Sequence, residues 1–134
     1  RLDDDDLDED ARIAMINILA DFLRELNPNT ETIKAVNNAL STFAKILRSR
    51  DANDRELFKY SVALRRVSCF ATGMVQPGFS RRAAVIILMG ALSDPDESVR
   101  TTAISGLIEI TNQNFGEKTE AWQKWFEKYG NTLN

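Results

Sequence analysis

The sequence contains no histidine and a single cysteine, Cys69. Without histidine, the usual general base of enzymes and the commonest metal ligand are both missing. One cysteine can form neither an internal disulfide nor a structural zinc site. The chain also lacks a glycine-rich phosphate loop, a G-x-S-x-G motif and an S-x-x-K motif. We therefore expect no enzymatic activity, no catalytic residue, no metal site and no cofactor.

Cys69 itself lies beside Ser68 and Phe70 in a helix-forming segment. A lone cysteine in such a place is typically a small buried hydrophobe, and no histidine is present to activate its thiol. The absence of disulfides is compatible with a reducing compartment, which favours the cytoplasm.

Long apolar runs and regular alternation are also absent. The longest apolar run, Ala83 to Leu92, is too short to cross a bilayer, so we expect no membrane insertion. No segment alternates with period two beside hairpin turns, which argues against a sheet. No signal peptide is recognisable, but the chain begins at Arg1 without an initiator methionine, so it is open whether it is a piece of a longer protein.

What the sequence does contain is helical periodicity. Its 134 residues are 43% apolar and 28% charged, which is typical of one globular domain. The acidic residues 1–7 have the composition of a disordered tail, and residues 8–134 are predicted to form a single helical domain. Apolar spacing and turn residues predict six helices, at about Asp8 to Leu26, Glu31 to Ser49, Asp54 to Thr72, Arg81 to Leu92, Pro95 to Asn112 and Glu117 to Tyr129.

The segment from Ala83 to Gly116 is the most informative. Its central turn places Asp94 as the expected N-cap of the fifth helix, with Pro95 at the first helical position and Glu97 completing a capping box. This helix is apolar on two sides and therefore needs neighbours on both, as stacked repeats do. One face carries Val99, Ala103, Gly106, Leu107 and Ile110, and the other carries Ile104 and Ile108.

This pattern of an apolar helix, a turn with Asp94-Pro95 and a helix beginning Val99-Arg100-x-x-Ala103 resembles a HEAT repeat over about a quarter of the chain. The resemblance implies an all-α fold, a HEAT-like α-α superhelix of about six helices. Such a fold is a short right-handed solenoid of the armadillo type with flanking cap helices. In that family the second helices of the units form the layer that holds partners, and no catalytic residues are implied.

A degenerate second copy lies 41 residues upstream, within the period of such repeats. Asn53 repeats the capping position of Asp94, but Arg66 stands where Leu107 would be. We predict that the second and third helices form one unit and the fourth and fifth another, with the first and sixth covering the ends. Four aromatic side chains of the sixth helix are expected to pack inward: Trp122, Trp125, Phe126 and Tyr129.

Charge is unevenly distributed although the net charge is only −3. Residues 1–10 carry seven acids and one base, whereas Lys45 to Arg82 contains nine bases and three acids. On the predicted third helix, Arg55, Lys59 and Arg66 lie within about 40° of one another, opposite the apolar stripe. This predicted basic ridge is either a solvated helix face or a site for an acidic protein segment, a phosphate backbone or the chain's own acidic tail.

The sequence therefore predicts a non-catalytic protein–protein interaction scaffold or adaptor, with Arg55, Lys59 and Arg66 as the partner-binding residues. One alternative is a nucleic-acid-binding helical repeat domain that uses the basic Lys45 to Arg82 region, although no aromatic residues suited to base stacking are interleaved with the bases. The other alternative is a self-associating structural domain whose end helices stack between copies. The identity of the partner and the oligomeric state stay open.

Overall fold

The computed structural model describes residues 8–133, so the predicted acidic tail of residues 1–7 lies outside the described residues. Within this range the chain is all-α, as predicted, and strand pairing is limited to one isolated bridge between Arg50 and Phe58. The helices are α1 (Glu9–Leu23), α2 (Thr30–Arg48), α3 (Val62–Thr72), α4 (Arg81–Ala91), α5 (Glu97–Thr111) and α6 (Thr119–Tyr129), followed by a short 3-10 helix, η1 (Gly130–Thr132).

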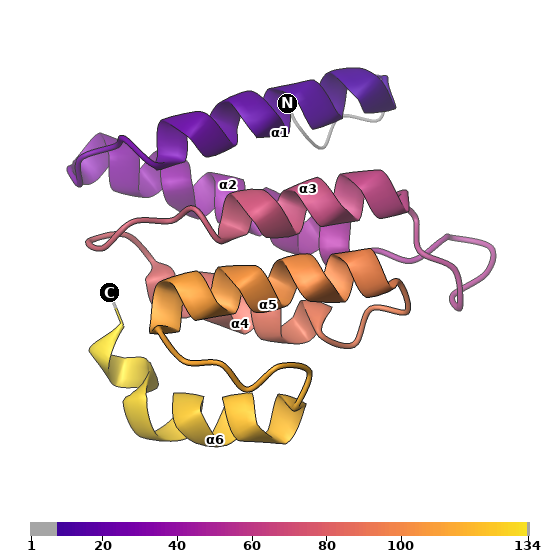
Figure 1. Cartoon of the computed structure of the whole chain (residues 1–134). Helices are drawn as coiled ribbons and strands as arrows, with labels where there is room; N and C mark the ends of the chain where they lie inside the picture. Colours follow the sequence, from indigo (N-terminus) through magenta and orange to yellow (C-terminus); the bar gives the residue numbers. More distant parts are fainter. Residues whose placement is uncertain (1–7, 134) are drawn as a thin grey trace.

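The helices form two layers (Figure 1). In one layer α3 lies between α1 and α5, and these three helices run in the same direction. In the other layer α2 packs on α3 and α4 packs on α5, which confirms the predicted pairing into two units. The four helices α2 to α5 therefore contact neighbours in both layers, which is the arrangement of a helical repeat-like fold. α6 lies beside α4 at the end of the stack and covers it, as expected.

A single hydrophobic cluster connects the helices. Each of the six α-helices contributes at least one fully or almost fully buried large side chain: Ile16, Phe43, Leu64, Leu88, Leu107 and Trp122. α2 is a typical amphipathic helix with one buried face and one exposed face. α5 has a fully buried face, and on its opposite face Ile104 also packs against the core.

At Gly106, α5 packs closely against α4 and the end of α3. A Cβ atom placed on Gly106 would lie 2.9 Å from Leu88 Cδ1 and 3.2 Å from Gly73 Cα. Gly73 directly follows α3, where the predicted third helix was expected to stop. The two glycines thus let the C-terminal end of α3 approach the middle of α5, and the predicted buried face of the fifth helix is confirmed.

The start of α5 differs from the prediction. Asp96, rather than Asp94, is the N-cap, and its carboxylate accepts hydrogen bonds from the backbone N–H groups of Ser98 and Val99. Asp94 is buried instead, and its carboxylate binds Arg65. The hydrogen bond from the Ser98 hydroxyl is the main reason that the pKa of Asp96 lies below its ordinary value.

The third helix is eight residues shorter at its N-terminus than predicted. Residues 49–61 form a short hairpin, here called the 49–61 hairpin, in which the N–H of Asp51 donates to Leu57 O and that of Lys59 donates to Ser49 O. The Asp51 carboxylate accepts two further backbone N–H groups, which fixes the turn. The helix begins only after Ser61, whose hydroxyl caps the N–H of Leu64. Asn53 caps no helix, so its predicted capping role in the upstream copy is wrong.

The remaining boundary shifts are small. α1 ends at Leu23 instead of Leu26, and α6 begins at Thr119 instead of Glu117. Between α5 and α6 the chain reverses through two positive-φ residues, Asn112 and Gly116, and passes along the stack, so that α6 runs in the direction of α5 (Figure 1). This connection makes α6 a covering helix rather than the first helix of another unit.

Candidate functional site

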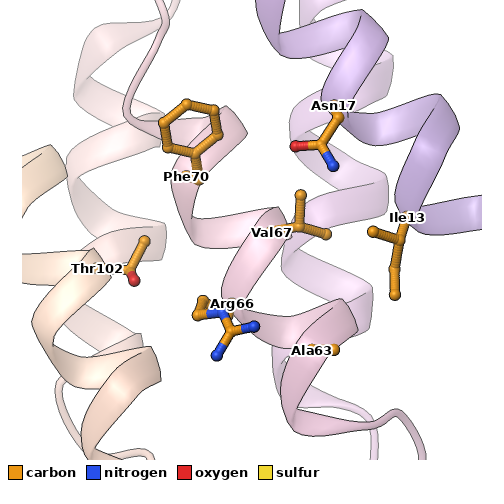
Figure 2. Close-up of a pocket in the computed structure, with 7 residues that line it drawn as sticks. All are labelled: Ile13, Asn17, Ala63, Arg66, Val67, Phe70 and Thr102. Atoms are coloured by element: carbon orange, nitrogen blue, oxygen red, sulfur yellow. The ribbon is translucent and has the colours of Figure 1, made fainter.

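A hollow of about 410 Å³ lies over the middle of the α1–α3–α5 layer and is here called the front groove. All three helices line it, through Ile13, Asn17, Ala63, Arg66, Val67, Phe70 and Thr102. Figure 2 shows Ile13 and Asn17 on one side, Thr102 on the other, and the side chains of α3 between them. The groove exists because α1, α3 and α5 lie side by side.

The front groove combines an apolar surface with one cation. Val67 is buried, while Phe70 keeps 38% of its surface exposed although it is a large aromatic residue. Arg66 is exposed and is the only charged residue in the lining, and its Nη1 reaches Ser98 Oγ at the long distance of 3.4 Å. The guanidinium therefore keeps donors for a further acceptor, and Phe70 provides an adjacent apolar contact.

The groove continues along the α3–α5 contact. A smaller hollow of about 140 Å³ shares Phe70 and Thr102 with the first, and it extends past Met74 and Ser105 to Glu109. The two hollows together follow much of the length of α3. An elongated surface of this kind suits a peptide segment better than a compact small molecule.

The predicted basic ridge does not exist as a helix face. Arg55 and Lys59 lie in the 49–61 hairpin, and only Arg66 lies on α3. The side chain of Arg66 lines the front groove, whereas Arg55 and Lys59 do not. The hypothesis rested on a helix from Asp54, and the Asp51 turn with the Ser61 cap replaces that part of the helix.

The other bases between residues 45 and 82 have separate surroundings. Arg65 is buried and forms a two-point ion pair with Asp94, with distances of 2.9 and 3.1 Å. Arg50 and Arg65 both lie about 4 Å from the centre of the Phe58 ring, so they stack on its opposite faces. Arg81 donates to Ile110 O, and partial burial lowers its pKa. The region is therefore no continuous basic surface.

A second hollow lies on the opposite layer and is here called the rear groove. It has a volume of about 420 Å³ and lies between α2 and α4. Its lining consists of Asn37, Leu40, Ser41, Ala44, Arg48, Ser80, Ala83, Ile86 and Ile87. We did not predict this site from the sequence. One sequence feature could have indicated it: no acidic residue occurs from Thr32 to Arg50 or from Leu57 to Ser93.

Cys69 is fully buried, as predicted, and burial raises the pKa of its thiol to about 12. The aromatic residues of α6 are only partly as predicted. Trp122 is fully buried, donates through Nε1 to Gly116 O and meets the Phe115 ring edge-on. Tyr129, at the end of the helix, is 41% exposed instead of packed inward. Neither residue belongs to a groove.

Residues 8–133 contain no cluster of three or more acidic or cysteine side chains that could hold a metal ion. None of the helices in this range is both long and apolar enough to span a membrane. No protein-family model, curated protein or solved structure matches the chain.

Proposed function

We propose that this domain is a non-catalytic protein–protein interaction module of the HEAT-like repeat kind, and that the front groove is its partner-binding surface. The single observation that carries the proposal is the exposed pair Arg66 and Phe70 on the central helix of the α1–α3–α5 layer. α3 and α5 are the second helices of their units, and the resemblance to HEAT repeats assigns partner binding to that layer.

The chemistry of the groove defines its occupant. An apolar side chain can contact Phe70 and Val67, while a carboxylate or carbonyl oxygen of the same segment accepts from Arg66. Exposed aromatic and arginine residues are the side chains that contribute most to protein interfaces. The partner is therefore a protein segment with an acidic residue next to a large apolar residue.

A displayed library of random 12-residue peptides, selected on the full chain, tests this proposal. Selected peptides should bind Arg66→Gln and Phe70→Ser at least about tenfold more weakly than the original protein. Tyr129→Ser on α6 is the matched control, because it removes a similarly exposed aromatic side chain that lines neither groove. Selected peptides that bind all of these proteins equally would refute the front groove as the binding surface.

Self-association is a second candidate function, favoured by α1. Met15, Ile18 and Phe22 are 40 to 59% exposed and form a stripe on the side of α1 that points away from the core. Sedimentation velocity over a hundredfold range of concentration tests it. Growth in size that is lost in Ile18→Lys would support stacking through this end, and an unchanged monomer would exclude it.

The nucleic-acid alternative has less support, because the bases between Lys45 and Arg82 are dispersed and Arg65 is buried. A complex held by phosphate contacts would weaken steeply as the salt concentration rises. Binding of a single-stranded oligonucleotide at increasing salt concentrations therefore distinguishes it from a protein partner.

A further inference from the structure

The rear groove has the shape of a site for a short helical or extended segment. Leu40 and Ile87 form its buried floor, and the small side chains of Ala44 and Ala83 leave room above them. Ile86 is 39% exposed at its edge. Asn37 and Arg48, at its two ends, are eleven residues apart on α2, which corresponds to about 16 Å, or three helical turns.

The charged side chains that line the rear groove or lie beside it are basic. Arg48 is the only charged lining residue, and Lys34 and Lys45 are exposed on the same side of α2. On α4 the exposed Arg82 lies near the ring of Phe126. The only acid on either helix is Glu31, in the first turn of α2. The α1–α3–α5 layer differs, since acids are exposed on both of its outer helices: Asp10, Asp21, Glu97 and Glu109.

The polar groups of the rear groove are mainly donors. Ser80 donates its hydroxyl hydrogen to Asn37 Oδ1, which orients the amide so that its NH₂ group is available to an acceptor. At the other end the guanidinium of Arg48 has only N–H donors. An occupant therefore needs oxygen acceptors near both ends and apolar side chains between them.

We infer that the rear groove is a second binding site, separate from the front groove, for an amphipathic segment of a partner protein in which aliphatic side chains are flanked by Asp or Glu residues. Charge complementarity with Lys34 and Arg48 selects the acidic flanks. The apolar floor selects the aliphatic side chains. A nucleic acid fits less well, because no aromatic side chain lines the groove for base stacking and phosphates gain nothing from an apolar floor.

Two displayed libraries of 15-residue peptides test this inference on the full chain. In both, Leu, Ile, Val or Phe occupies positions spaced by three and four. The remaining positions are Asp, Glu, Ala or Gln in the first library, and Lys, Arg, Ala or Gln in the second. The first library should yield binders and the second should not. Amide chemical shifts of the labelled protein should change at Asn37, Ser41, Arg48 and Ile86 when a selected peptide is added.

Amino-acid substitutions then test whether the selected peptides bind in the rear groove. The double change Lys34→Glu with Arg48→Glu, and the single change Ile86→Ser, should each weaken the selected peptides at least about tenfold. Arg55→Glu makes the same charge reversal in the 49–61 hairpin, and Phe70→Ser alters the front groove, so both should bind normally. The inference is wrong if the basic library yields binders equally well or if the acidic library yields none. It is also wrong if the changes at Arg48 and Ile86 leave the affinity of the selected peptides unchanged. It is also wrong if a single-stranded oligonucleotide displaces the peptides and binds Ile86→Ser as tightly as the original protein.

Discussion

At Gly106, α5 lies close to α4 and to the end of α3, because a Cβ at this position would be 2.9 Å from Leu88 Cδ1 and 3.2 Å from Gly73 Cα. Gly106→Leu should therefore overpack the contact and lower the free energy of unfolding by about 1 to 3 kcal/mol. Thr101→Leu is the matched control, since Thr101 is exposed on the same helix and the change should be almost silent. Thermal melts of both variants check the difference. Equal stability would contradict the packing described for α5.

Cys69 provides a prediction about pH. Its pKa is raised from an ordinary value of 9.0 to about 12, mainly by burial. Between these values the unfolded chain loses the thiol proton and the folded chain keeps it, so stability should decrease as the pH rises from 9 towards 12. The slope due to this group is at most about 1.4 kcal/mol per pH unit. Denaturant unfolding at several pH values should show that Cys69→Ala removes this part of the slope, and identical slopes would exclude it.

At the scale of elements, local sequence patterns predicted most helices and their pairing. α2 and α5 were recognisable from their apolar spacing, and the turn before α5 was also recognisable, although its capping residue is Asp96 and not Asp94. The 49–61 hairpin was missed because Leu57 and Tyr60 continue the helical spacing of the later residues of α3. In the structure Leu57 is 57% exposed, so this continuation is not a buried stripe. The hydrogen bonds that the Asp51 carboxylate accepts hold the backbone of this segment in a turn instead of a helix.

Neither groove could be predicted in this way. The front groove is lined by three helices, and no single helix contains a pattern that describes it. Arg66 was identified as a site residue, but for its place on a predicted ridge and not for its place in the groove lining with Phe70. The rear groove depends on α2 and α4 lying side by side, which apolar spacing within each helix does not reveal. A site that is formed by the packing of several helices can be located only when that packing is known.

The ion pair of Arg65 and Asp94 connects the start of α3 to the turn before α5, and Arg65 also donates to Tyr60 O near the end of the 49–61 hairpin. Asp94→Asn should leave a buried guanidinium without its counter-charge and cost about 3 kcal/mol or more. Asp21→Asn, an exposed acid on α1, should cost little. Denaturant unfolding measures both. A small loss in Asp94→Asn would mean that the pair contributes little to joining these elements.

The whole molecule has two grooves on opposite layers, and the charged side chains around them differ. The front groove contains one cation in a layer that exposes acids, whereas the rear groove lies among cations. The arrangement suits a module that holds two different protein segments at once, because the two grooves share no lining residue. Binding at one groove should then leave the other available.

Replacement of Arg55, Lys59 and Arg66 tests whether partners bind the three residues of the predicted basic ridge or the front groove. The triple change to Gln should alter the melting temperature little, because all three residues are exposed and exposed charges contribute little to stability. Only Arg66 lines the front groove, so Arg66→Gln alone should weaken the selected 12-residue peptides as much as the triple change does. The pair Arg55→Gln with Lys59→Gln should bind them normally. Binding affinities of the three variants, measured at one salt concentration, test this. If the hairpin pair loses as much affinity as the triple variant, the 49–61 hairpin is the binding surface and the front groove is not.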